Sequence, residues 1–464
     1  MRDVPPDLLH RLRTYRQEHV LTGWETMSRP DRAALLEQLA GIDLAHIDAL
    51  YRARDQVQEL PSADRIAAVT MNPPTAWTNT DRQTGDEMLS RGEVAVLLVA
   101  GGQGSRLGFD KPKGMFPIGP VSGKSLFAIH ADKVFALSRR YGKPIPFLIM
   151  TSPATHVETV EYFEQNRFFG LPKSEVYFFE QGTMPAVDLK TGGLVLEQPG
   201  KLFAGPNGHG GTLTALADSG LLDDLRRNGV RTIFYLQVDN PLVKIADPIF
   251  LGQHRALNAE ASSKAIEKAF PKEKMGVLSL IDGRCGIIEY SDMPDELLHA
   301  VNADGRLLHR AGNPAIHIFD VDFLARITQG ETRLPYHYAR KKVPYTDAAG
   351  NAVIPTSENA LKFELFIFDA LPLADRYLVQ EALRSEEFSP VKNADGLDSP
   401  ATATRDLINL AGSWLEQAGL TLLRDDKGNV SVPVEVSPRF ALDPQELTGR
   451  VRPGRTIDSA LLLE

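Results

Sequence analysis

Short apolar runs alternate with longer segments of helical spacing over the central part of the chain. Four runs rich in aliphatic and aromatic residues predict buried strands at residues 94–100, 147–150, 176–179 and 232–238. Apolar strands separated by helical segments are typical of a largely parallel sheet with helices on both faces. Further short runs at 276–280, 286–290 and 315–319 add strands beside it. The pattern predicts a Rossmann-like α/β fold built on a mixed sheet.

The ends of the chain follow other patterns. Apolar residues before residue 55 recur at helical spacing, and Ser28 followed by Asp31 predicts that the second helix begins at this pair. Residues 430–436 alternate with the period of a strand. We therefore expect three parts: a helical N-terminal region (1–85), a Rossmann-like catalytic domain (86–394) and a small C-terminal β-containing domain (395–464).

Composition excludes several classes of protein. The net charge is −9, from 51 Lys and Arg against 60 Asp and Glu, which argues against binding of nucleic acid or an anionic membrane. The longest apolar run is much shorter than the roughly 20 residues that cross a bilayer. Cys285 is the only cysteine, so an intrachain disulfide and a zinc site of the CxxC kind are both excluded. A cytoplasmic location is expected.

A glycine-rich stretch follows the first buried strand and carries the chemistry. It reads GGQGSRLG at residues 101–108 and continues as KPKGM at 111–115. Missing side chains at Gly101, Gly102 and Gly104 let backbone amides approach a phosphate closely. A purely structural turn is the alternative, but Arg106 and Lys113 in the same connection favour a polyphosphate site.

Two better-known glycine loops fit the sequence poorly. The dinucleotide fingerprint needs a third glycine where Leu107 stands. Residues 119–125 are one residue short of a Walker A loop. Neither a dinucleotide site nor a P-loop is therefore expected.

The stretch resembles the signature of the eukaryotic-type UDP-sugar pyrophosphorylases, and most of all that of the UDP-N-acetylglucosamine pyrophosphorylases. Further segments resemble that family in the same order: QGTMPA at 181–186, GHGG at 208–211, VDNPL at 238–242, IEYS at 288–291 and FSPVKNA at 388–394. The resemblance implies a nucleotide-diphospho-sugar transferase fold. It also implies that UTP and a sugar 1-phosphate react to give UDP-sugar and pyrophosphate.

Site roles are carried over from the resemblance residue by residue. Arg106, Lys113 and Lys392 are the expected catalytic residues, and Asp239 is the expected ligand of Mg²⁺. The nucleotide is expected at Gly101, Gly102, Gly104, Gln181 and Gly208, and the sugar at His209, Gly276, Glu289, Tyr290, Asn313 and Lys362.

Charge explains these assignments. The phosphate of a sugar 1-phosphate must approach the anionic α-phosphate of UTP, so fixed cations and a magnesium ion are needed to offset repulsion. Asp239 follows a buried strand and would emerge where open α/β sheets bind ligands. A turn or helix-capping role for Asp239 is the alternative. For the DxD pair of Asp320 and Asp322, we favour a helix start.

The identity of the sugar stays open. The acetylglucosamine-specific members usually carry asparagine where His209 stands, and a second asparagine where Ile316 stands. N-acetylglucosamine 1-phosphate is the first expectation, and UDP-glucose or broad UDP-sugar specificity is the alternative. A non-catalytic protein that binds UDP-sugar is the alternative from another class, and the presence of Arg106, Lys113 and Asp239 argues against it.

Overall fold

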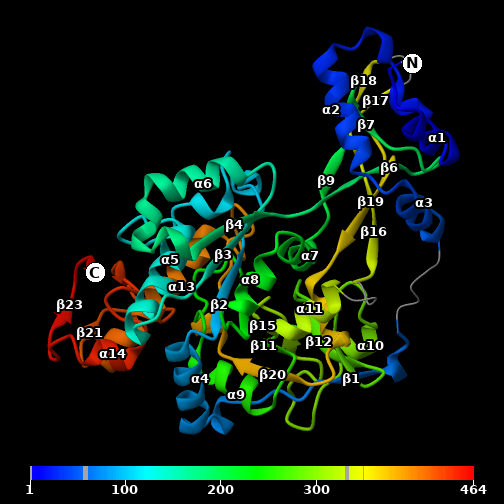
Figure 1. Ribbon diagram of the computed structural model, residues 1–464. Coiled ribbons are helices and arrows are strands. Elements are labelled where there is room, and N and C mark those ends of the chain that lie inside the picture. The colour runs from blue at the N-terminus through cyan, green and yellow to red at the C-terminus, as the bar shows by residue number, and fades with distance from the viewer. Residues whose placement is uncertain (1–2, 56–60, 330–333, 348–349) are drawn as a thin grey trace. The chain divides into compact units, whose positions relative to one another are not determined.

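The chain divides into two compact units (Figure 1). The computed structural model describes residues 3–55, 61–329, 334–347 and 350–464. The N-terminal unit combines Met1–Leu60, Gln181–Thr212 and Leu334–Ile367, and the sheet unit combines Pro61–Glu180, Leu213–Arg333 and Phe368–Glu464. Each unit thus draws on segments far apart in sequence, and the expected three-part division remains a prediction.

The sheet unit is built on a large mixed sheet. Its strands, as far as the residues are described, lie in the order β1 (Ile66–Ala68), β12 (Val277–Ile281), β14 (Ala311–Gly312), β11 (Ala261–Glu267), β15 (His317–Asp320), β10 (Thr232–Gln237), β2 (Val94–Val99), β3 (Phe147–Thr151) and β4 (Val176–Glu180), with β13 (Arg284–Ile288) beside β12 and β20 (Tyr377–Ala382) beside β11. Strands β10, β2, β3 and β4 are mutually parallel. Strand β15 pairs antiparallel with both β10 and β11. The predicted fold class and the four predicted parallel strands are confirmed.

One face of the parallel strands forms the main hydrophobic core. Alternate residues of β2, Val94, Val96 and Leu98, pack with the buried side chains of neighbouring strands and helices. The helices that contribute are α4 (Asn79–Arg91), α5 (Leu126–Tyr141), α6 (His156–Gln165), α9 (Pro248–Ala256) and α13 (Pro400–Gln417). The core fixes the strands, whose carboxyl ends meet at one edge of the sheet.

The other described helices outside the first 55 residues are short. They are α7 (Gly211–Asp218), α8 (Leu221–Arg227), α10 (Asp295–Leu298), α11 (Val321–Gln329), α12 (Arg384–Glu387) and α14 (Pro444–Thr448). Asp320 accepts hydrogen bonds from the amides of Asp322 and Phe323, and so caps the start of α11, as the sequence favoured.

The N-terminal unit has a separate core. Its helices are α1 (Pro6–Thr14), α2 (Arg29–Ala40) and α3 (Leu44–Ala53), and Ser28 caps α2 as predicted. Their apolar faces pack against residues from the middle of the chain, such as Val187 and Phe363. These belong to β6 (Val187–Asp188) and β19 (Ala360–Leu365), which form a sheet with β16 (Tyr336–Lys341). Further strand pairs are β5 (Thr183–Pro185) with β9 (Ala204–Pro206), β7 (Leu196–Gln198) with β8 (Lys201–Leu202), and β17 (Tyr345–Thr346) with β18 (Ala352–Val353).

Residues 400–464 belong to the sheet unit and begin with the long helix α13. Two small parallel pairs follow: β21 (Thr421–Leu422) with β23 (Thr456–Ile457), and β22 (Val434–Val436) with β24 (Leu461–Leu463). The strand predicted at 430–436 is therefore present only over its last three residues.

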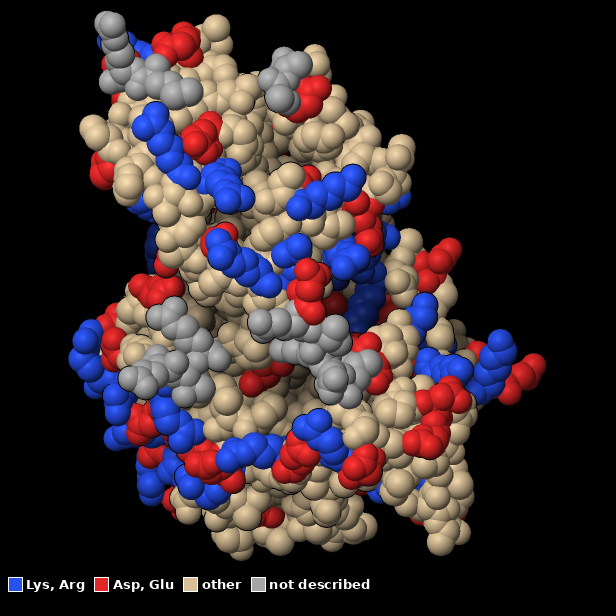
Figure 2. All heavy atoms as spheres, turned by 90° about the vertical axis from the view of Figure 1, so that its right-hand side faces the viewer, with Lys and Arg blue, Asp and Glu red and all other residues tan. Residues whose placement is uncertain are grey.

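The surface carries both basic and acidic side chains, as the similar numbers of each in the sequence predict. Acidic and basic side chains are interspersed on the face drawn in Figure 2. Within the described residues, no helix is both long enough and apolar enough to cross a membrane.

Candidate functional site

The glycine-rich loop leaves β2 at the carboxyl edge of the sheet. Its shape is fixed by backbone contacts, because Gly104 donates to the carbonyl of Lys111 (2.9 Å) and Lys113 donates to that of Gly102 (3.0 Å). A Cβ atom at Gly104 would lie 2.8 Å from the ring of Phe109, so this position requires glycine. At Gly102 there is open space instead.

Ser152 anchors the start of the loop, since its hydroxyl donates to the carbonyl of Gly101 (2.8 Å). By contrast, the amides of Gly102 and Gln103 donate to no acceptor within the described part of the chain. Amides of this kind are suitable donors for phosphate oxygens.

The expected cation and the expected metal ligand lie together. The Lys113 ammonium is 3.7 Å from Oδ2 of Asp239, and both side chains are largely buried. Strands β2 and β10 are parallel neighbours, with Val99 paired to Gln237. Their carboxyl ends therefore bring the glycine loop and Asp239 to the same edge. Arg106 lies in the same loop, on the exposed 3-10 turn η5 (Ser105–Leu107).

Lys392 comes from a third segment at this edge. The amide of Val391 donates to the carbonyl of Asp239 (2.8 Å), so the residue before Lys392 is tied to the expected metal ligand. The Lys392 ammonium lies over the ring of Phe388, 5.4 Å from its centroid. Burial, with a smaller contribution from Asp292, raises the pKa of Glu289, and the positive charge of Lys392 opposes this rise.

The other expected sugar residues lie nearby in the sheet. Asn313 donates from its amide to the carbonyl of Gly276 (2.9 Å), and its side-chain oxygen accepts from Ala315 (2.9 Å). A Cβ atom at Gly276 would lie 2.7 Å from Cγ2 of Ile287 and 3.5 Å from Oε1 of Glu289, so the backbone of Gly276 lies close to both side chains. Ile316 is fully buried in the main core. Its side chain is therefore a packing residue and not a polar group that faces a ligand.

The N-terminal unit carries Gln181, Gly208, His209 and Lys362, whereas Tyr290 lies in the sheet unit, two residues after the end of β13. The side-chain amide of Gln181 donates to the carbonyl of Gly208. Gly208 has a positive φ of 85°, and a Cβ atom there would lie 2.3 Å from the carbonyl oxygen of Leu365. Lys362 is on β19, with its ammonium 5.4 Å from the centroid of the Phe203 ring. Gln181 therefore uses at least one donor to hold the glycine loop of this unit.

His209 is locked into the same loop. Its Nδ1 accepts a hydrogen bond from the amide of Ile367 (3.1 Å), and its ring stacks on Phe366 at 5.4 Å. Burial, together with the nearby His337, lowers the pKa of His209 to about 4. The imidazole is therefore neutral at physiological pH.

Asn240 supports the site through buried hydrogen bonds, and the sequence alone did not identify it. Asn240 is buried and accepts from the amide of Ser389 (3.1 Å), while it donates to the carbonyl of Glu387 (2.7 Å). It thereby joins the end of β10 to the segment that carries Lys392. Its place beside Asp239 in the VDNPL segment was the available signal.

The small number of candidate ligands around Asp239 limits the ways in which a metal ion could bind there. No group of three or more His, Cys, Asp or Glu suited to a metal ion occurs within the described ranges. Asp239 would therefore bind an ion together with substrate oxygens, and not within a cage of protein ligands. Mg²⁺ commonly binds through one or two carboxylates and substrate phosphates, so the residues present fit such an ion.

Comparison with known proteins assigns the family. The family model described as UTP–glucose-1-phosphate uridylyltransferase matches residues 51–413. The chain belongs to this family. The uridylyltransferase activity expected from the sequence is thereby confirmed at the level of the enzyme class, as is the resemblance to UDP-sugar pyrophosphorylases.

Relatives of this uridylyltransferase cover nearly its whole length. UDP-N-acetylhexosamine pyrophosphorylase-like protein 1 of Xenopus tropicalis is 40% identical over 88% of this chain and 83% of its own. UDP-N-acetylglucosamine pyrophosphorylase of Saccharomyces cerevisiae is 36% identical over 93% of this chain and 94% of its own. Among solved structures, UDP-N-acetylglucosamine pyrophosphorylase of Trypanosoma brucei, in complex with an inhibitor, has a TM-score of 0.81 at 27% identity, covering 98% of this chain and 97% of that one.

Proposed function

We propose that this uridylyltransferase uses UTP and N-acetylglucosamine 1-phosphate to make UDP-N-acetylglucosamine and pyrophosphate. Named relatives of similar length support this choice of sugar. The observation that carries the proposal is the pairing of Lys113 with Asp239 at the sheet edge that also bears the glycine loop. One cation and one anion at that point suit a triphosphate and the metal ion that accompanies it.

In the reaction, the phosphate of the sugar 1-phosphate replaces pyrophosphate on the α-phosphorus of UTP. An oxygen of the sugar phosphate forms a bond to the α-phosphorus of UTP, and the bond from that phosphorus to the bridging oxygen of pyrophosphate breaks. No protein nucleophile is required, since positioning and charge stabilisation carry most of the catalysis of phosphoryl transfer.

Each cation has a separate proposed role. Arg106 and Lys113 hold the triphosphate and stabilise the charge that develops on the leaving oxygen. Lys392, whose charge acts on Glu289, holds the phosphate of the incoming sugar. The amides of the loop at Gly101, Gly102 and Gly104 bind the phosphates of UTP, while Gln181 and Gly208 contact its nucleobase.

Asp239 is the proposed ligand of Mg²⁺. When bound, this ion would supply positive charge that screens the repulsion between the two substrates. Asp239 and its neighbour Lys113 share one edge of the sheet, which supports a role for one carboxylate and one ammonium beside the phosphates.

A UDP-glucose specificity is the second candidate, because His209 occupies the position at which acetylglucosamine-specific members usually carry asparagine. Pyrophosphate release should be measured with UTP, Mg²⁺ and a panel of sugar 1-phosphates. The proposal predicts the highest kcat/KM with N-acetylglucosamine 1-phosphate. Turnover of glucose 1-phosphate alone would replace the proposed sugar, and no release with any sugar would reject the reaction.

A further inference from the structure

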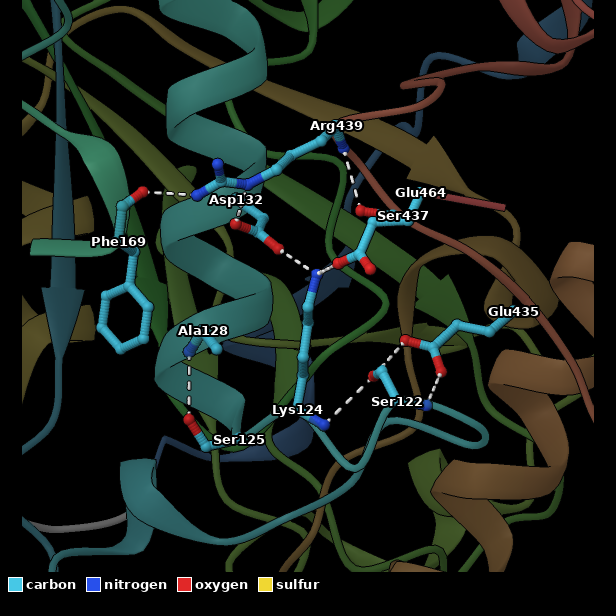
Figure 3. A network of polar contacts seen from close by, with 10 residues as sticks. All are labelled: Ser122, Lys124, Ser125, Ala128, Asp132, Phe169, Glu435, Ser437, Arg439 and Glu464. Atoms are coloured by element: carbon cyan, nitrogen blue, oxygen red, sulfur yellow. Dashed lines mark hydrogen bonds and ion pairs between the residues drawn. The ribbon is translucent and has the colours of Figure 1, made fainter. Parts of the chain in front are cut away.

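Helix α5 contacts the last part of the chain on one side and the catalytic elements on the other. Residues 435–464, here called the C-terminal segment, contact α5 and the loop at 119–125 before it through charged groups (Figure 3). This loop is here called the hairpin, because Pro117 and Ser125 at its base pair antiparallel. Arg140, near the end of α5, pairs with Asp443 (2.9 Å) and with Glu446. Arg139 donates to the carbonyl of Arg439 (2.6 Å).

Asp132 is the buried centre of this contact. One of its oxygens accepts from Arg439, and the other accepts from Lys124 (2.9 Å), which also binds Glu464 (Figure 3). The Arg439 guanidinium lies over the ring of Phe135 at 4.3 Å. A carboxylate this deeply buried needs its cationic partners, because an unpaired buried charge is strongly destabilising.

The neighbours of Asp132 hold the chain on both sides of Asp239. His130 contacts the carbonyl of Val238 through Nε2 (3.0 Å). Lys133 donates to the carbonyls of Pro241 and Val243 (2.5 and 2.8 Å). Three residues within one turn of α5 therefore join Arg439 to the backbone that carries Asp239.

A second connection runs to Lys113. The carboxylate of Glu435 accepts from the amide of Val121 (2.8 Å). It also accepts from the amide and the hydroxyl of Ser122 (2.8 and 2.7 Å), as Figure 3 shows. These contacts fix the loop at 119–125, which comes directly before α5.

The base of that hairpin lies next to Lys113. Leu126 donates to the carbonyl of Phe116 (3.1 Å), and Phe116 donates to that of Lys113 (3.0 Å). A Cβ atom at Gly114 would lie 2.3 Å from the Phe127 ring, so the backbone beside Lys113 is pressed against the first turn of α5. Displacement of the hairpin or of α5 would therefore move Lys113.

Apolar packing alone does not set the position of α5 against the C-terminal segment. A cavity of about 330 Å³ lies between them, lined by Ile129, Leu137, Trp414 and Leu442 together with the loop after Asp239. Glu435 and Arg140 are at its wall. Helix α5 itself is packed in the main hydrophobic core. Because a cavity removes packing partners from its lining, the charged contacts around it contribute to holding the C-terminal segment against this helix.

We propose that Glu435 and Arg439 are positioning residues for uridylyl transfer: Glu435 holds the hairpin that sets Lys113, and Arg439 holds the turn of α5 that sets Asp239. The C-terminal segment thereby acquires a role in catalysis without touching substrate. The inference rests on the proposed function, since it assigns these residues to the same site.

The test compares Glu435→Gln and Arg439→Gln with the full-length wild type. Each variant should lower kcat about tenfold while KM for UTP stays within about twofold, because a displacement well under 1 Å at reacting groups already slows reaction. Arg439→Lys keeps a cation for Asp132 and should recover most of the lost kcat. Glu416→Gln is the matched control, because Glu416 on α13 loses an ion pair with Arg424, and neither residue is a partner of Glu435 or Arg439 in the contacts above.

Two results would overturn the proposal. One is a kcat of both Gln variants equal to that of wild type and Glu416→Gln. The other is a parallel loss of kcat and melting temperature that Arg439→Lys fails to restore, which would assign a purely structural role.

A second readout separates this proposal from the proposed reaction. Hydrogen exchange should become faster at the amides of residues 113–116 in Glu435→Gln, with β3 unchanged, whether or not the wild type turns over. If the wild type releases no pyrophosphate with any sugar phosphate, the proposed function fails. Unchanged hydrogen exchange at residues 113–116 in Glu435→Gln would reject the positioning role, whatever the activity of the wild type.

Discussion

Lys113 and Asp239 lie 3.7 Å apart, although they come from separate strand–loop connections. Each neutralises the other in a place where both are largely buried. A triphosphate can take over the ammonium and a metal ion can take over the carboxylate, so the charges are available to substrate without either being left unpaired beforehand. The pair therefore makes two variants informative.

Lys113→Ala is expected to lower kcat by about 10²–10³-fold, the usual cost of removing one preorganised donor from a developing charge. Steady-state pyrophosphate release measures this directly. Lys111→Ala is the matched control, because Lys111 is an exposed cation in the same connection, and it contacts the loop through its backbone carbonyl, which alanine retains. Equal rates for the two variants would contradict the role of Lys113.

Asp239→Asn should raise the Mg²⁺ concentration needed for half-maximal rate at least about tenfold. Loss of a residue that only hydrogen-bonds a metal ligand already lowers metal affinity by about that much. The measurement is a magnesium titration of the rate at saturating UTP. Asp322→Asn is the control: Asp322 pairs with Arg226 (2.7 Å) at the start of α11. If Asp322→Asn shifted the magnesium titration and Asp239→Asn did not, the metal ligand would have to be assigned to Asp322 instead of Asp239.

Two glycines of the phosphate loop should respond differently to alanine. A Cβ atom at Gly104 meets Phe109, so Gly104→Ala should lower the free energy of unfolding by about 1–3 kcal/mol. At Gly102 a Cβ atom meets nothing, so Gly102→Ala should keep its stability but weaken UTP binding roughly tenfold by blocking close approach of the phosphates. Urea unfolding and calorimetry with UTP distinguish the two effects, and wild-type UTP affinity in Gly102→Ala would argue against the loop as a phosphate site.

The sequence predicted the parts of the fold that local pattern determines. The strands that end near Gly101 and Asp239 are continuous apolar runs, so their burial and their direction followed from pattern and motif. The N-terminal unit could not be predicted in this way, because Phe363 joins the core of the first helices across some three hundred residues. Ile316 is a similar case: its motif position suggested the sugar side, whereas its side chain packs in the core.

His209 offers a test of the loop in the N-terminal unit. His209→Asn keeps an acceptor for the amide of Ile367, whereas His209→Leu leaves that amide unpaired. We expect His209→Leu to lose about 1–3 kcal/mol of unfolding free energy, and His209→Asn to lose clearly less. Urea unfolding of both variants checks this order. If His209→Asn proved as destabilising as His209→Leu, stacking on Phe366 would be the dominant contribution of the ring.

Stability should decrease as the pH falls from about 6.5 to 5. Burial lowers the pKa of His130 and of His254 to about 3, so these rings stay neutral in the folded state while they become protonated in the unfolded chain near pH 6.5. The unfolded state then binds more protons, and the unfolding free energy falls by up to about 1.4 kcal/mol per pH unit for each histidine. Most carboxyl groups titrate below this window and add little to the slope. His254→Gln keeps a hydrogen-bonding group near Ser262 and should make the slope shallower, whatever its effect on stability at pH 7. Urea midpoints between pH 5 and 7 measure the slope, and an identical slope in wild type and variant would mean that His254 is protonated in the folded protein.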